Sequence, residues 1–205
     1  GHLDAMYDAL LKDDANRSVS TIRRVHATLQ SALNAAVKRR LIPWNPALHV
    51  ELPVAGKART QVWTPEQLGH FLDETAEHRL YSLFYLVAIC GLRRGEVLGL
   101  RWSDVHLDEG MLDVRQQVVD TGHGLAFGPP KTRSGVRTVV FHADLAEALR
   151  RHAQSQAAER QAWGSEWIDN GLVFARENGD VLRPEYVTHL FQRLTERANL
   201  PRIRF

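Results

Sequence analysis

The residues best suited to chemistry lie in a short segment around Arg93. Arg93 and Arg94 follow an apolar run, and Glu96 comes three residues after Arg93. Residues three apart share one face of a helix, so a helical segment would let Arg93 and Glu96 contact each other. Two interpretations stay open at this point. The contact is either a structural ion pair, or a device that holds a guanidinium rigid so that two parallel hydrogen bonds meet a phosphate.

The composition is compatible with a phosphate-binding surface. Of the 26 basic residues only four are lysines, although the formal net charge is only +2. Arginine binds phosphate through a planar fork that lysine lacks, but a GC-rich genome produces the same bias. Hydrophobic residues make up 44% of the chain, which predicts a buried core. Cys90 is the single cysteine, so no disulfide framework is possible and a reducing cell interior is the natural compartment.

Several other function classes find no support in the sequence. The longest apolar run, Leu83 to Cys90, is far shorter than the roughly 20 residues of a membrane span. The ten histidines show no spacing typical of a pair of metal ligands, which disfavours a metal-dependent nuclease. The Gly-x-Ser-x-Gly motif of serine hydrolases and the phosphate-binding loop Gly-x-x-x-x-Gly-Lys-Ser/Thr are both missing. Gly1 and His2 precede a sequence that begins in mid-pattern, which we interpret as a cloning scar on an excised segment.

The first part of the chain predicts an amphipathic helix from Ser20 to Arg40, with Ser18 or Ser20 as its cap. Its apolar residues recur at spacings of three and four: Ile22, Val25, Leu29, Leu33 and Ala36. An earlier short helix around Leu3 to Leu11 would pack against it. The opposite face is basic, with Arg23, Arg24, Lys38, Arg39 and Arg40, and is either simply solvated or a surface that follows a nucleic-acid backbone.

A domain boundary is predicted after this helical region. Residues 1–48 form the first unit, 49–62 a linker that contains Lys57 and Arg59, and 63–205 the second unit. The second unit begins with a capped helix, because Thr64, Pro65 and Gln67 match the start of a capping box. That helix is expected to run to about Ala76.

The second unit predicts helices around a small antiparallel sheet, and therefore a mainly α fold of the α+β class. Tyr81 to Cys90 is apolar nearly all round, as in a central buried helix. Strand-like stretches are expected at Met111 to Val119 and Val136 to Phe141, with a short strand at Leu172 to Phe174. We expect Asp144 to cap a helix that ends near Trp163 and Pro184 to open the last helix, whose inner face carries Val187, Leu190, Phe191, Leu194 and Ala198.

Two motifs resemble those of the tyrosine recombinase family, also called the phage integrases. The segment Gly91 to Asp104 reads Gly-Leu-Arg-x-Gly-Glu-x-Leu-x-Leu-x-Trp-x-Asp and is similar to the family's first arginine motif. The segment Pro130 to Val139 resembles the hairpin turn that carries the family's lysine. Weaker likenesses cover Leu41 to Ala47, near the end of the family's helical core-binding domain, and Leu172 to Val187.

The resemblance implies metal-independent and cofactor-independent DNA recombination through a 3′-phosphotyrosyl link. Arg93, supported by Glu96, would neutralise the scissile phosphate, and Lys131, on a mobile turn, would protonate the leaving 5′-oxygen. The partner would be double-stranded DNA attachment sites inside a bacterial cell, bound by a clamp with contacts mainly to phosphate. The residues we expect to contact DNA are Arg23, Arg24, Lys38, Lys57, Arg59, Arg94 and Arg133.

The chain departs from the family pattern in one respect. None of the ten histidines is followed by an arginine three residues later, so the family's His-x-x-Arg motif is missing, and the nucleophilic tyrosine should come after that motif. We therefore expect Tyr7, Tyr81, Tyr85 and Tyr186 to be packing residues. The chain is interpreted as a fragment of a parent recombinase, itself monomeric and unable to cleave DNA, whereas the parent acts as a tetramer. The alternative is a non-catalytic DNA-binding or regulatory module with the recombinase fold.

Overall fold

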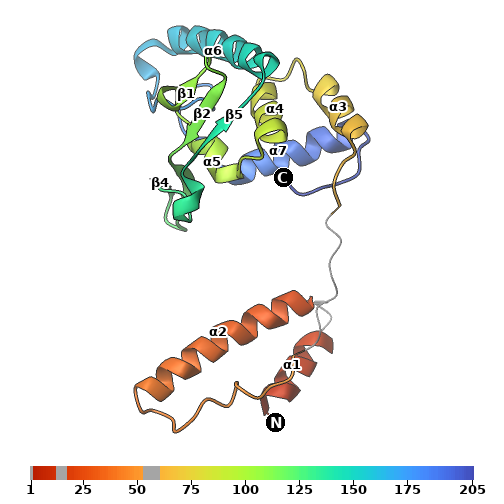
Figure 1. The fold of residues 1–205 in the computed structure, drawn as a ribbon, viewed down its shortest axis with the longest axis vertical. Helices are drawn as coiled ribbons and strands as arrows, with labels where there is room; N and C mark the ends of the chain where they lie inside the picture. The colour runs from red at the N-terminus through yellow and green to blue at the C-terminus, as the bar shows by residue number, and fades with distance from the viewer. Residues whose placement is uncertain (1, 13–17, 53–60) are drawn as a thin grey trace. The chain divides into compact units, whose positions relative to one another are not determined.

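The computed structural model describes residues 2–12, 18–52 and 61–205. The chain folds as two compact units, Gly1–Thr60 and Gln61–Phe205 (Figure 1). The predicted linker residues Lys57 and Arg59 lie outside the described residues. No helix in the described ranges is both long and apolar enough to cross a membrane.

The first unit consists of α1 (His2–Lys12), α2 (Val19–Lys38) and the return segment, residues 39–52, which follows α2. The Ser18 hydroxyl accepts from the Thr21 amide at 3.2 Å, so Ser18 is the cap of α2. Ile22 is fully buried, while the rest of the predicted apolar stripe is half-buried. The buried Asn45 side chain donates to the Asn34 side chain at 2.7 Å and to the Gln30 carbonyl at 3.1 Å. These bonds fasten the return segment to α2.

The helices of the second unit enclose a hydrophobic core that contains a cluster of aromatic rings. α3 (Pro65–Glu74) begins with the predicted capping box, in which Thr64 and Gln67 exchange side-chain to backbone hydrogen bonds. α4 (Tyr81–Cys90) is the predicted buried helix, and α6 (Ala143–Trp163) packs on it. α7 (Pro184–Arg197) contributes Phe191, whose ring lies 5.3 Å from that of Phe71 and 6.0 Å from that of Phe84. Apolar packing therefore joins α3, α4 and α7, which lie close together in Figure 1.

The strands form two small antiparallel sheets. One has the order β1 (Val105–His106), β2 (Met111–Val114), β5 (Arg137–Val140), with Met111 opposite Val140. The other pairs β3 (Gln117–Asp120) with β4 (Leu125–Gly128). The mainly α fold with a small antiparallel sheet is therefore confirmed. Short 3₁₀ turns at Trp102–Asp104, Arg133–Gly135 and Gly164–Glu166 complete the unit.

Three local predictions were wrong. Met111 to Val119 is not one strand, because β2 pairs with β5 and the following residues leave that sheet to form the hairpin with β4. Leu172 to Phe174 makes only an isolated bridge, between Leu172 and Arg101. The N-cap of α6 is His142 rather than Asp144, which lies in the first turn, where a carboxylate favours the positive end of the helix dipole.

The helix α5 (Arg94–Gly99) lies unusually close to the β3 backbone. A Cβ atom on Gly95 would lie 2.7 Å from the Val118 carbonyl oxygen, and one on Gly99 would lie 2.9 Å from the Gln117 Cα. Neither contact is sterically possible without movement of backbone. The two glycines, one helical turn apart, thus form a flat helix face on which the β3–β4 hairpin rests.

Replacing Gly99 by alanine is expected to push this hairpin off α5. Because the obstacle is backbone rather than a side chain that can rotate, we predict a loss of about 1–3 kcal/mol in the free energy of unfolding. Amide exchange of residues 117–128 should also become faster. Gly69→Ala in α3 is the matched control, since a Cβ there meets nothing within 4 Å and alanine favours a helix by about 0.8–1.0 kcal/mol. Equal stability of the two variants would contradict the packing argument.

Candidate functional site

Arg93 lies at the junction of two helices with its side chain toward solvent. α4 ends at Gly91 in the left-handed conformation, and Arg93 is the N-cap of α5, with φ −67° and ψ 149°. Its side chain is 65% exposed. The predicted contact with Glu96 is present, but Arg93 precedes the helix instead of lying within it. The guanidinium of Arg93 therefore lies at the surface of the unit.

Glu96 is a buried carboxylate shared by two arginines. Its side chain is only 1% exposed. One oxygen, Oε1, accepts from Nη1 of Arg93 at 2.7 Å. The other, Oε2, accepts from Nη2 of Arg137 at 2.9 Å and from the backbone amide of Arg93 at 3.1 Å. Glu96 therefore fixes both the backbone and the side chain of Arg93.

Electrostatics keep Glu96 ionised. Burial by itself raises the pKa of the Glu96 carboxyl, but hydrogen bonds from Arg137 and Arg93 outweigh it and hold the pKa below its ordinary value. A single arginine beside this carboxylate would form a neutral pair. With two guanidinium groups around one carboxylate, the cluster keeps a net positive charge, and the exposed Arg93 presents that charge to solvent.

Lys131 lies on the loop between β4 and β5 and is exposed. Both ends of this loop are anchored. Before Lys131, the Pro129 carbonyl accepts from Nε2 of Gln117 at 2.9 Å. After it, the Gly135 carbonyl accepts from Nη1 of Arg137 at 3.1 Å. Since Gln117 rests against Gly99 and Arg137 binds Glu96, both anchors lead back to α5.

A model of the phage integrase family matches residues 61–205. The chain belongs to this family. It is 27% identical over 207 residues to a tyrosine recombinase XerC-like protein of Caldanaerobacter subterraneus subsp. tengcongensis, covering 92% of this chain and 53% of that protein. It is 29% identical over 145 residues to the ICEBs1 integrase of Bacillus subtilis, covering 69% and 38%. The chain thus spans about half, or less, of these relatives' lengths.

Solved structures of phage integrase family members share the fold. An integrase of the Tn1549 transposon in complex with transposon right end DNA superposes with a TM-score of 0.79 at 21% identity, covering 96% of this chain and 63% of that one. A lambda integrase tetramer bound to a Holliday junction gives a TM-score of 0.62 at 16% identity, covering 99% and 52%. At these identities the likeness shows the fold alone.

The remaining predicted site residues are dispersed. Arg94 points to α7, where its Nη1 donates to Thr188 Oγ1 at 2.7 Å and to the Pro184 carbonyl at 3.3 Å. It therefore joins two helices of the integrase-family unit, α5 and α7. Arg23, Arg24 and Lys38 are exposed on α2 in the other unit. The Arg133 side chain lies outside the described part of the structure.

Sequence reasoning missed Arg137 as a member of the cluster. It lay within the strand-like stretch Val136 to Phe141 and the motif segment Pro130 to Val139 but was given no role, and it comes 41 residues after Glu96. The available signal was a charged residue at the start of a short strand, directly after the lysine loop. That signal is weak, because charged residues at strand ends are common on solvated faces.

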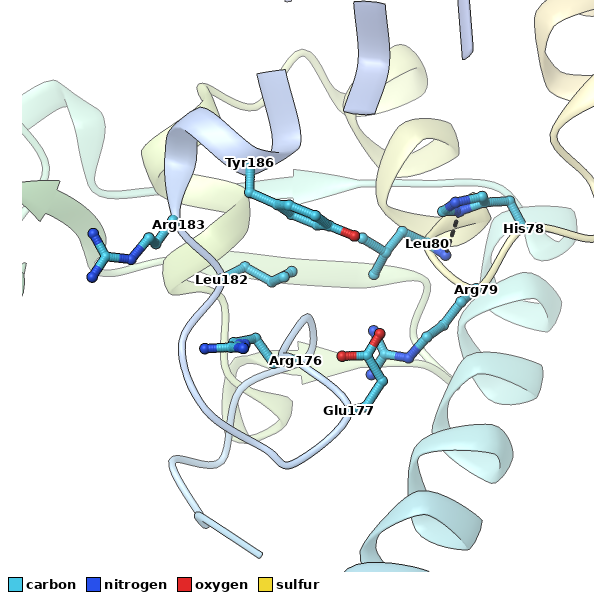
Figure 2. A pocket seen from close by; sticks show the side chains of 8 residues that line it. All are labelled: His78, Arg79, Leu80, Arg176, Glu177, Leu182, Arg183 and Tyr186. Atoms are coloured by element: carbon cyan, nitrogen blue, oxygen red, sulfur yellow. Dashed lines mark hydrogen bonds between the residues drawn. The ribbon is translucent and has the colours of Figure 1, made fainter. Parts of the chain in front are cut away.

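A pocket of about 430 Å³ lies elsewhere, between the α3–α4 connection and the start of α7 (Figure 2). Its lining includes neither Arg93, Glu96 nor Lys131, and consists of His78, Arg79, Leu80, Arg176, Glu177, Leu182, Arg183 and Tyr186. Tyr186 is 45% exposed there, so the prediction that it is a packing residue was wrong. Among the described residues, no cluster of three or more His, Cys, Asp or Glu side chains is arranged to hold a metal ion.

The variant Glu96→Gln is expected to lower the free energy of unfolding by about 1–3 kcal/mol near neutral pH, because it removes the charge that both arginines contact. The lowered pKa of Glu96 sets the pH dependence. Its contribution is fully present above the ordinary value of 4.5 and is lost as the pH falls through the lower folded-state value. The stability difference between wild type and variant should therefore shrink below pH 4.5.

Urea unfolding followed by tryptophan fluorescence, repeated from neutral to acidic pH, measures this difference. Glu109→Gln, at an exposed loop position, is the control and should change stability little at any pH. A Glu96→Gln variant as stable as wild type at neutral pH would show that the shared carboxylate does not hold the cluster together.

Proposed function

We propose that the full-length protein containing this chain is a site-specific DNA recombinase that integrates or excises DNA at attachment sites. The observation that carries the proposal is the arginine cluster at the start of α5, in which a buried carboxylate orients Arg93 and leaves the cluster positive. Membership of the phage integrase family, whose members cleave and join DNA, supports it.

Arg93 neutralises the phosphate in this proposal. As a nucleophile attacks phosphorus, negative charge builds on the non-bridging oxygens, and a fixed guanidinium stabilises this charge more in the transition state than in the ground state. Glu96 removes the cost of orienting Arg93 at the moment of reaction. The 65% exposure of the Arg93 side chain leaves it accessible to a DNA backbone.

Lys131 supplies the proton in the second half of the step. A tyrosine hydroxyl, provided by a part of the protein outside this chain, loses its proton to solvent as its oxygen forms a bond to phosphorus, while the bond from phosphorus to the 5′-oxygen breaks. The ammonium of Lys131 passes its proton to that oxygen, giving a free 5′-hydroxyl and a 3′-phosphotyrosyl link. The reverse step rejoins DNA, and its energy comes from the phosphotyrosyl bond without metal or nucleotide.

The helical unit contributes DNA binding in the same proposal. Its exposed basic residues on α2 contact phosphates, so that this unit adds affinity for DNA largely independently of base sequence. We further propose that the protein acts inside a bacterial cell as a tetramer on two paired sites, whereas this chain by itself is a monomer that does not cleave DNA.

The covalent step is tested on the full-length protein with a nicked suicide substrate of its attachment site in the presence of a chelator. Wild type should give a covalent protein–DNA adduct on a denaturing gel. Arg93→Ala should slow adduct formation by about 10²–10³, because a donor to the transition state is lost. Lys131→Ala should slow it by about 10²–10⁴.

The control for the adduct assay is Arg160→Gln, which removes an arginine from an exposed ion pair with Asp169. It should form adduct at the wild-type rate. If wild type binds DNA in a salt-sensitive manner and yet gives no adduct on any candidate site, the protein is the non-catalytic module instead.

DNA binding by α2 is tested on this chain through its salt dependence. Each phosphate contact contributes about −0.9 to the slope of log Kobs against log salt concentration. Substitution of Arg23, Arg24 and Lys38 by glutamine should therefore make the slope shallower by up to about 2.7. Fluorescence anisotropy with duplexes of unrelated sequence measures it. An unchanged slope, with helicity preserved, would show that this face is merely solvated.

A further inference from the structure

Arg137 occupies an unusual place at the start of β5. Its planar guanidinium donates in two directions, from Nη2 to Glu96 on α5 at 2.9 Å and from Nη1 to the Gly135 carbonyl at 3.1 Å. Its side chain is 31% exposed, so it is partly withdrawn from solvent. One residue thus touches both the carboxylate that holds Arg93 and the end of the loop that carries Lys131.

Gly135 contacts the residues on both sides of Lys131, so a displacement of Gly135 would also displace Lys131. Gly135 and Pro130 are both buried and lie against each other, and a Cβ on Gly135 would come 2.5 Å from the Pro130 Cβ. The Gly135 amide also donates to the Thr132 carbonyl at 2.9 Å. Lys131 sits directly between Pro130 and Thr132, so its backbone is held on both sides by residues that contact Gly135.

The charge balance gives Arg137 a second effect. Without it, Glu96 would be paired with Arg93 alone, and the carboxylate would cancel much of the charge that Arg93 presents to an anion. With it, Glu96 is neutralised from the far side. Arg93 is then oriented by the carboxylate, and the cluster of Arg93, Glu96 and Arg137 keeps a net positive charge.

We propose that Arg137 is a positioning residue for DNA cleavage, which sets the geometry of Arg93 and of Lys131 relative to each other through one guanidinium. This inference rests on the proposed function. Arg137 does not touch the reacting atoms; its partners on the protein account for both ends of its guanidinium. A misplacement of about 1 Å at a reacting group can cost about 10²-fold in rate, so a bridge between the two groups has a large effect.

The test measures single-turnover cleavage by the full-length protein at saturating enzyme, with Arg137→Gln beside wild type. We expect the rate to fall about 10- to 100-fold, while the dissociation constant for the DNA changes less than about threefold, because positioning acts on the step after binding. Arg150→Gln is the matched control, since Arg150 also bridges a carboxylate (Asp108) and a backbone carbonyl (Leu107). It should cleave at the wild-type rate.

A second substrate separates the effect of Arg137 on Arg93 from its effect on Lys131. In a 5′-bridging phosphorothiolate the leaving group is a thiolate, which needs no proton, so the step no longer depends on Lys131. The Arg137→Gln defect should become smaller on this substrate but remain measurable through Arg93. A defect that is unchanged, or one that disappears, means that Arg137 serves only one of the two groups and overturns the proposal.

The conservative variant Arg137→Lys distinguishes a loss of positioning from a loss of folding. It keeps a positive charge beside Glu96, so the thermal unfolding midpoint should stay near wild type, but an ammonium lacks the planar fork that spans two partners. We expect its cleavage rate to remain reduced at least about threefold. A folded Arg137→Lys variant that cleaves at the wild-type rate would refute the proposal that one guanidinium positions both Arg93 and Lys131. If wild type itself forms no adduct, the proposed function fails, whereas active wild type with an equally active Arg137→Gln refutes this inference alone.

Discussion

The arrangement of the candidate site depends on one buried carboxylate. A charge at the 1% exposed position of Glu96 is tolerated only when its oxygens are fully engaged, since a buried ion without partners costs several kcal/mol. Two guanidinium groups and one backbone amide meet this requirement. Because all three donors have fixed directions, the same requirement that stabilises the fold also determines where Arg93 points.

The short helix α5 links this cluster to the sheet region. Its buried face supplies Val97 and Leu98 to the core, Glu96 meets the arginines, and Gly95 and Gly99 receive the β3 backbone. Six residues thus provide packing, charge and close approach on different sides. A substitution on α5 is therefore expected to disturb more than one of these. The close approach of the β3 backbone accounts for glycine at two helical positions, despite its low helix propensity.

Local features of this chain could be predicted from the sequence, and long-range ones could not. The Thr64–Gln67 capping box, the buried helix Tyr81–Cys90 and the Arg93–Glu96 contact each depend on residues within one or two turns. The break between β2 and β3 instead depends on the pairing of β2 with β5, more than 20 residues later in the chain. The contact of Arg137 with Glu96 depends on the same pairing, so a correct motif did not reveal the second arginine.

The cluster also explains how a cationic site can be rigid before an anion binds. Two guanidinium groups brought together without a counter-charge would repel each other, and their side chains would move apart. Glu96 removes that repulsion and leaves a positive remainder, so Arg93 can be held in place in the free protein. When a phosphate approaches, little reorganisation is required, and donors that are already oriented contribute more to a developing charge than mobile ones. Arg137 therefore contributes to the orientation of Arg93 through the carboxylate that both of them contact.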